Sequence, residues 1–260
     1  MADTWAYRLL RGALAGVAGG VASATMLWIL VEPALQSAIA LEGSDGAAMP
    51  DHSDVGGAAH GHDSGEIVSR LQQQIGGTLT VVVVGVLMGV IFAVLYARSR
   101  HRLPGTTDLG KSLALGALIF TVVAVLPAFL VPANPPGVGD PNTVTTRTLT
   151  YVLAIGLGVL VIGAVFAVNR VLFSRGIPLE RVWMATAGVT ILLFGAVLAL
   201  APSINESVPS AVPASLIWQF RVGSLAQLGS LWLTIGLVHG YLAHKAVARE
   251  RSEQFSLASG

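Results

Sequence analysis

The sequence contains no cysteine and very little charge. Without cysteine, the chain can form no disulfide, no thiolate metal site and no thiol nucleophile. Charged residues make up only 11% of the 260 residues, whereas a soluble domain carries about 25%. So few charges cannot cover the surface of a water-soluble globule, but they suit a protein that is surrounded by lipid.

The apolar residues are gathered into six runs, each long enough to cross a membrane. A hydrocarbon core of about 30 Å needs about 20 residues of helix. Backbone amides in lipid must be bonded within their own segment, and these runs do not alternate as barrel strands do, so we expect helices. The prediction is an all-α, polytopic bundle in a single domain over residues 1–245. Its six transmembrane helices are predicted at 9–31, 72–97, 112–131, 149–169, 182–201 and 217–243.

The basic residues predict the orientation. One set of segments consists of the N-terminus, 98–111, 170–181 and a tail at 246–260, and together with Lys245 just before the tail it carries twelve of the fifteen Lys and Arg residues. The other side keeps only Arg70, Arg147 and Arg221. Basic residues accumulate on the cytoplasmic side of membrane proteins, so we expect both termini in the cytoplasm. Residues 34–69 then form a flexible loop on the outer side.

The stretch GTTDLGKS at 105–112 matches the phosphate-binding loop G-x-x-x-x-G-K-[ST]. A working loop of this kind lies between a buried strand and a helix, but here a basic connector precedes it. We expect Pro104 and Gly105 to turn the chain and Thr107 or Asp108 to cap the next helix. The prediction is that no nucleotide binds, and the chain carries no signature of nucleic-acid binding or of a known enzyme class.

The chain reads as three similar helical hairpins, each with an outward helix followed by a return helix. The outward helices are expected to end at Pro33, at Pro127 with Pro132, and at Pro202. Each return helix begins at an arginine and stays polar for about two turns. At helical spacing the polar residues share one face. These groups are Arg70, Gln74 and Thr78; Arg147, Thr150 and Tyr151; and Arg221 and Ser224.

Two interpretations of these polar faces are open. They line a vestibule that is open to the outside, since polar residues at membrane depth face a bundle interior or a water-filled cavity. Alternatively, they lie in the headgroup zone and their arginines reach lipid phosphate. Packing is simpler to predict: Gly12, Gly16 and Gly20, Gly85 and Gly89, and Gly236 and Gly240 recur every fourth residue, which allows helices to approach closely.

Metal ligands are concentrated in the predicted outer loop. Residues 49–66 read MPDHSDVGGAAHGHDSGE and supply imidazole and carboxylate groups that suit divalent cobalt, nickel, copper or zinc. A flexible acidic linker is the alternative, because the loop is rich in Gly, Ala and Ser. Glu32, at the end of the first run, is either a cation ligand or the partner of a vestibule arginine. The predicted metal residues are His52, Asp54, His60, His62, Asp63 and Glu32.

Several stretches together resemble the CbtA family of predicted cobalt transporters. They are RLLRGALAGVAGGVASATMLWILVEP, LPAFLVPANPPG, TTRTLTYVLAIGLG and FRVGSLAQLGSLWLTIGLVHGYL. The resemblance implies cobalt import beside vitamin B12 synthesis, and it implies that the partner is a small, single-span, histidine-rich subunit. The positions that match the family pattern are Glu32-Pro33, Pro127, Arg147 and Arg221. The family is usually described with five spans, whereas six are counted here.

The resulting prediction is a transporter of the bacterial inner membrane, or a subunit of one, for a divalent transition metal. The cargo is cobalt, with nickel as the next candidate, and no cofactor is bound tightly. Two alternatives are kept. One is a membrane scaffold or metal-sensing subunit that does not transport, and the other is a permease for an anion or a metal chelate. We expect no enzyme activity, and the bilayer itself is the first partner.

Overall fold

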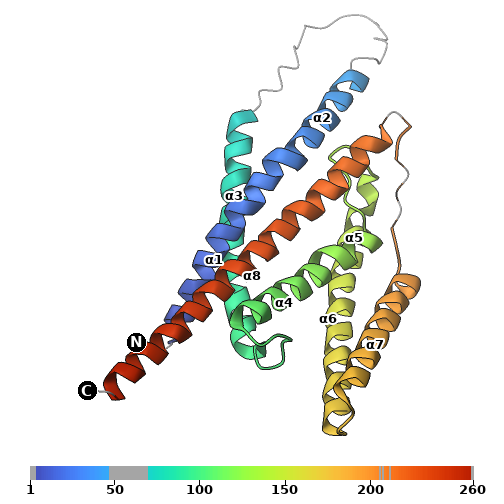
Figure 1. Ribbon diagram of the computed structural model, residues 1–260. Helices are drawn as coiled ribbons and strands as arrows, with labels where there is room; N and C mark the ends of the chain where they lie inside the picture. Colours follow the sequence, from blue (N-terminus) through green and yellow to red (C-terminus); the bar gives the residue numbers. More distant parts are fainter. Residues whose placement is uncertain (1–3, 47–69, 205, 207, 211, 259–260) are drawn as a thin grey trace, which may run out of the picture.

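The computed structural model describes residues 4–46, 70–204, 206, 208–210 and 212–258. Within these residues all regular secondary structure is helical, with no strand (Figure 1). The elements are α1 (Trp5–Met26), the π-helical η1 (Leu27–Val31), α2 (Glu32–Gly46), α3 (Arg70–Ser99), α4 (Asp108–Phe120), the π-helical η2 (Thr121–Val125), α5 (Leu126–Leu130), the 3-10 turn η3 (Pro141–Thr143), α6 (Val144–Ser174), α7 (Leu179–Leu200) and α8 (Ala214–Ala258).

Six helical stretches are long and apolar enough to cross a membrane, which confirms the predicted all-helical, multi-pass class. The stretches are Trp5–Leu41, Gln72–Ser99, Asp108–Leu130, Pro141–Ser174, Leu179–Leu200 and Ala214–Ala248. Their large apolar side chains remain exposed along much of each helix, as expected where the surroundings are lipid rather than water.

Two spans are interrupted by a π-helical turn directly before a proline. At η1 the Glu32 amide bonds the Leu27 carbonyl, five residues back, and Pro33 follows. At η2 the Leu126 amide bonds the Thr121 carbonyl, and Pro127 follows. Proline has no amide hydrogen, so it cannot donate the hydrogen bond that an α-helix forms with the carbonyl four residues back. The π-helical turns therefore lie where proline interrupts the α-helical hydrogen bonds.

The helix ends differ from the prediction at the prolines. We expected the first helix to end at Pro33, but α2 continues to Gly46, and the predicted loop 34–69 is therefore helical over 34–46. Proline is tolerated in the first turn of a helix, and Pro33 is the second residue of α2. The expected tail at 246–260 is also helical over 246–258, since α8 runs to Ala258. At the third position the prediction is confirmed: α7 ends at Leu200, two residues before Pro202.

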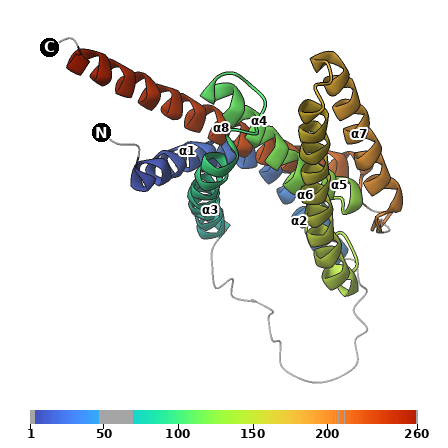
Figure 2. The same cartoon turned by 90° about the horizontal axis from the view of Figure 1, so that it is seen from below.

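Two groups of helices make up the molecule. α1 packs along both α3 and α8, and α4 also packs along α8, whereas α6 packs against α5, η2 and α7 (Figures 1 and 2). Of the three expected sequence-adjacent pairs, α1 and α3 contact extensively. In the second pair α4 packs mainly against α8, and only its continuation through η2 and α5 contacts α6. In the third pair the main neighbour of α7 is α6 and not α8. Both termini lie at the same end of the molecule (Figures 1 and 2). We call this the termini end, and the opposite one the loop end.

Glycine explains the closest of these contacts. A methyl group on Gly12 would lie 2.5 Å from the Gly89 carbonyl oxygen, and one on Gly16 would lie 2.4 Å from the Gly85 carbonyl oxygen. The predicted small-residue contact is therefore confirmed between α1 and α3. Beside it, Phe92, Ile235 and Trp232 form the centre of an apolar core between α3, α4 and α8.

Candidate functional site

The carboxylate of Glu32 lies at the junction between η1 and α2, within the first span and nine residues before its last residue, Leu41. Its Oε1 accepts hydrogen bonds from Gln74 Nε2 at 2.8 Å and from Gln36 Nε2 at 3.3 Å. Gln74 is one of the predicted vestibule residues, and it reaches Glu32 across the contact between α2 and α3. The half-buried Glu32 carboxylate therefore has two side-chain amide donors beside it.

A second polar link joins α3 to η1, one helical turn before Glu32. Trp28 Nε1 donates to Thr78 Oγ1 at 2.9 Å, and the Thr78 hydroxyl donates to the Gln74 carbonyl at 2.8 Å. Gln74 and Thr78, on the predicted polar face of α3, therefore bond to Glu32 of α2 and to Trp28 of η1. Arg70 begins α3, but its side chain lies outside the described residues.

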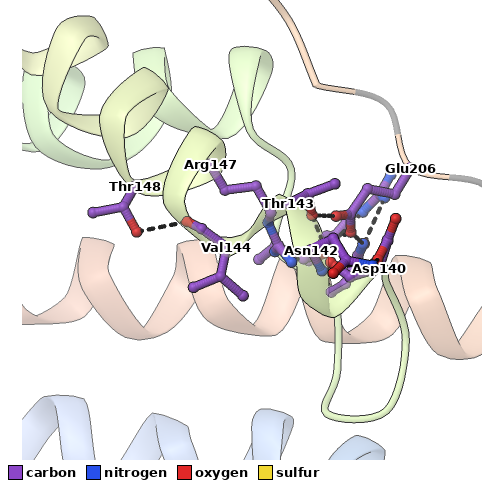
Figure 3. A network of polar contacts seen from close by, with 10 residues as sticks. Asp140, Asn142, Thr143, Val144, Arg147, Thr148 and Glu206 are labelled. Carbon is purple, nitrogen blue, oxygen red and sulfur yellow. Dashed lines mark hydrogen bonds and ion pairs between the residues drawn. The ribbon is translucent and has the colours of Figure 1, made fainter.

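The predicted vestibule residue Arg147 lies in a polar cluster with Glu206 (Figure 3), and Arg221 is linked to the same cluster through Asn134. Glu206 stands at its centre, with its side chain only 6% exposed. Its Oε2 lies 3.3 Å from Arg147 Nη1 and accepts from Asn134 Nδ2 at 3.1 Å, and its Oε1 accepts from the Thr143 hydroxyl. Arg221 joins through Asn134: its Nη2 donates to Asn134 Oδ1 at 2.9 Å, and its Nε donates to the Ala133 carbonyl at 3.1 Å. We call these residues the Glu206 cluster.

The backbone around the cluster is shaped to admit the carboxylate. Gly139 has a φ of +132°, and a methyl group there would lie 2.4 Å from Glu206 Oε2. A side chain at this position would be strained by the backbone and would also strike the acid. One residue later, Asp140 accepts a hydrogen bond from the Asn142 amide at 2.8 Å and so caps the turn that leads into α6.

A cavity of about 450 Å³ adjoins the Glu206 cluster, between η2, α5, α6 and α8. Three predicted vestibule residues line it: Tyr151, Arg221 and Ser224. The remaining walls are mostly apolar. The Tyr151 hydroxyl donates to the Val123 carbonyl at 2.6 Å. This is the carbonyl four residues before Pro127, which cannot bond it, so the tyrosine satisfies a group that the proline leaves open.

The predicted polar faces are thus divided between two places. Gln74 and Thr78 meet η1 and Glu32, whereas Tyr151, Arg221 and Ser224 share the cavity beside the Glu206 cluster. The loop residues His52, Asp54, His60, His62 and Asp63 lie outside the described residues. In the part of the chain that is described, no three His, Asp or Glu side chains gather as a metal site.

Glu206 and Asn134 were not among the predicted site residues. One signal was present: Glu206 is the only acid between residues 201 and 213, on the side predicted to carry Arg147 and Arg221. Its partners are distant in the sequence: Arg147 lies 59 residues before Glu206 (206 − 147), and Asn134 lies 72 residues before it (206 − 134). Local spacing does not contain that information.

At the termini end, the octapeptide 105–112 serves as a turn and a helix start. It follows a helix, and the Thr107 hydroxyl accepts a hydrogen bond from the Gly110 amide at 3.1 Å, so Thr107 is the predicted cap of α4. Asp108 accepts from the Tyr96 hydroxyl at 2.8 Å. His239 is buried and packs edge-on against Phe92 and Tyr96, as expected for a packing histidine.

Comparison with known proteins assigns the family. No curated protein and no solved structure matches the chain significantly. The family model described as probable cobalt transporter subunit (CbtA) matches residues 7–244, which takes in all six apolar spans apart from a few terminal residues. Because the match extends over most of its length, the chain belongs to the CbtA family of probable cobalt transporter subunits.

Proposed function

We propose that this protein carries divalent cobalt inward across the bacterial inner membrane and so supplies vitamin B12 synthesis. Membership of a family of cobalt transporter subunits supports the cargo. The single structural observation that supports the route is Glu32, a carboxylate held by Gln74 and Gln36 within the first span. Ionisable residues within transmembrane segments are rare, and they mark ion and substrate pathways.

The proposed route has two stages. His52, Asp54, His60, His62 and Asp63 gather the ion on the outer side, since imidazole and carboxylate ligands suit cobalt and nickel. Glu32 then receives the ion at the mouth of the spans. A histidine-rich single-span subunit would contribute to the first stage, where it would add ligands of the same kind. Members of the family are transporter subunits, which supports a partner of some kind.

The arginines near the route bear on the charge of the cargo. Unpaired cations would repel a dication, whereas Arg147 lies 3.3 Å from the Glu206 carboxylate, and Arg221 bonds an amide and a carbonyl oxygen. The pairing of Arg147 lowers the positive potential at the loop end. Arg221 keeps its positive charge, because its two bonded oxygens are neutral, so the alternative of an anion or a chelate stays open for the uptake experiment to decide.

The membrane potential can drive the proposed movement. One elementary charge that crosses 100 mV gains about 2.3 kcal/mol, and a dication gains twice that. No nucleotide is required for this step. The direction follows from the predicted orientation, in which the interior is negative and Glu32 faces the outside.

Uptake of radioactive cobalt into vesicles that contain the purified protein tests the proposal. The Glu32→Gln variant keeps an oxygen that can accept from Gln74 but loses the charge, so we expect cobalt uptake to fall about tenfold or more. Glu180→Gln is the matched control, because Glu180 is an exposed acid at the start of α7, at the termini end. Its uptake should equal that of the unmodified protein.

The outcomes separate the alternatives. Normal uptake by Glu32→Gln would remove Glu32 from the route. If the unmodified protein accumulates no cobalt while a peptide of residues 43–69 binds it, the chain is a sensor or scaffold. Uptake of a cobalt chelate in preference to the free ion would favour the chelate permease.

A further inference from the structure

A cavity of about 590 Å³ lies between α4 on one side and α6 and α7 on the other. It exists because the helices diverge: α6 packs on η2 and α5, whereas α4 packs along α8. In Figure 1, α4 and α6 run apart from the region of α5 toward the termini end. Neither the Glu32 site nor the Glu206 cluster includes any residue of the wall. We call this space, which extends from Arg102 to Gly158, the α4–α6 groove.

The α4–α6 groove runs along one half of α6. Its wall on this helix begins at Gly158, the fifteenth of the 31 helical residues, and ends at Phe173, the thirtieth. That length of helix is about 22 Å, and one leaflet of a bilayer with its headgroups is about 20–22 Å thick. The groove therefore has the depth of a single leaflet, on the side of the termini end.

Close packing ends the groove in the middle of the span. Gly158 is buried, and a methyl group on it would lie 3.1 Å from both Leu126 Cδ2 and Val122 Cγ1. The contact of α6 with η2 and α5 therefore forms the inner end of the groove. A transmembrane helix of another chain crosses the whole membrane, so a groove that ends halfway does not suit it. A flexible chain that enters from one leaflet does fit.

The polar side chains within the groove use their donors inside the protein. The Thr121 hydroxyl donates to the Ala117 carbonyl at 2.8 Å, and the Thr190 hydroxyl donates to the Thr186 carbonyl at 2.8 Å. Asn169 Nδ2 donates to Thr186 Oγ1 at 3.3 Å. The rest of the wall consists mostly of aliphatic and aromatic side chains. A hydrocarbon chain needs no hydrogen-bond donor, and close contact with such a wall stabilises it.

The mouth of the groove suits the headgroup of a phospholipid. Arg102, in the connector before α4, and Trp183, near the start of α7, both line the groove and are exposed. Tryptophan is enriched at the level of the lipid headgroups, and arginine can donate two hydrogen bonds to one phosphate. Every phospholipid carries a phosphate, whatever its net charge, so this match requires no excess of positive charge at the mouth.

We propose that the α4–α6 groove binds one phospholipid of the leaflet at the termini end. An acyl chain lies along α6 as far as Gly158, and the phosphate lies beside Arg102. The chain fills the space between α4 and the pair formed by α6 and α7, and so holds the two groups of helices together. This inference does not depend on cobalt transport, because no residue of the Glu32 site lines the groove.

Native mass spectrometry of the full-length protein in detergent tests the proposal. The probes are dioleoyl phosphatidylethanolamine and glycerophosphoethanolamine, which has the same headgroup without the acyl chains. We expect one phosphatidylethanolamine molecule to be retained after the loosely held surface lipids are removed, and we expect glycerophosphoethanolamine not to be retained.

Two variants fill the groove from opposite walls. Ala117→Phe adds a ring on α4, and Thr190→Phe adds one on α7. Each should lower retention of phosphatidylethanolamine about tenfold, the factor that corresponds to roughly two methylene groups displaced from an apolar site. Both residues are exposed, so both variants should fold, which thermal unfolding checks. Ala187→Phe is the matched control, because Ala187 is an exposed alanine of α7 that does not line the groove, and its retention should be unchanged.

Three results would overturn the proposal. One is equal retention of phosphatidylethanolamine by Ala117→Phe, Thr190→Phe and the unmodified protein. Another is retention of glycerophosphoethanolamine as strong as that of the full lipid, because the acyl chains would then contribute nothing. The third is a change from dimer to monomer in both variants without a change in lipid retention, because the groove would then hold a helix of a second copy. Cobalt uptake, measured in the same preparations, reports on the transport proposal separately.

Discussion

Glu206 is the residue whose loss should most disturb the loop end, because one carboxylate connects four segments of the chain. Glu206→Gln would replace the ion pair with Arg147 and weaken the charge-assisted bonds from Asn134 and Thr143. Hydrogen bonds to charged groups contribute about 1.5–3 kcal/mol each, and the side chain is nearly buried, so we expect a lower thermal unfolding temperature in detergent. Combining Glu206→Gln with Arg147→Gln provides the check. If the two act through one pair, the double variant should be less destabilised than the sum of the single variants. Additive losses would show that the pair contributes nothing.

How far single residues could be predicted depended on the range of their contacts. Glu32, Arg147 and Arg221 stand out in the sequence because a charged residue beside an apolar run is rare. Their partners do not stand out. Asn134 lies in an irregular segment 87 residues before Arg221, and no helical or strand period connects the two. The role of the loop histidines stays a prediction, since they lie outside the described residues.

At the scale of the helix, the contact between α1 and α3 depends on the absence of side chains at Gly12, Gly16, Gly85 and Gly89. In Gly16→Ala, the new methyl group would lie 2.4 Å from the Gly85 carbonyl oxygen, so the two backbones would have to separate and lose packing along their length. We expect a clear fall in the thermal unfolding temperature and in the yield of folded protein. Gly163→Ala in α6 is the matched control, because a methyl group there would meet no neighbouring atom within 4 Å. Alanine also favours helix more than glycine does, so this variant should be unchanged or slightly more stable. Equal losses from both variants would contradict the role of close packing.

The helices themselves were predictable because their signal is local, and their ends were less so. Six long apolar runs require six spans in lipid, whatever their neighbours. Proline was taken as a stop signal at Pro33, yet the π-helical turn before it absorbs the missing bond, and α2 continues to Gly46. α2 then has a reason to persist: Ala34 and Ala38 are buried against Leu216 of α8. That contact lies about 180 residues away along the chain (216 − 34 = 182), beyond the reach of a sequence pattern.

At the scale of the whole molecule, the orientation in the membrane decides which way a bound ion would travel. Helix α6 runs from the loop end to the termini end. Asn142 lies just before its first residue and Ser174 is its last residue, and both are exposed. The natural chain has no cysteine, so Asn142→Cys and Ser174→Cys each introduce a single thiol. The excess of arginine and lysine at the termini end predicts that this end is cytoplasmic. A membrane-impermeant maleimide should therefore label Asn142→Cys in intact cells, and it should label Ser174→Cys only after the cells are opened. Labelling of both sites after lysis shows that each thiol is reactive. The opposite pattern would place Glu32 on the cytoplasmic side. The membrane potential would then oppose, rather than drive, the movement of a dication from Glu32 to the termini end.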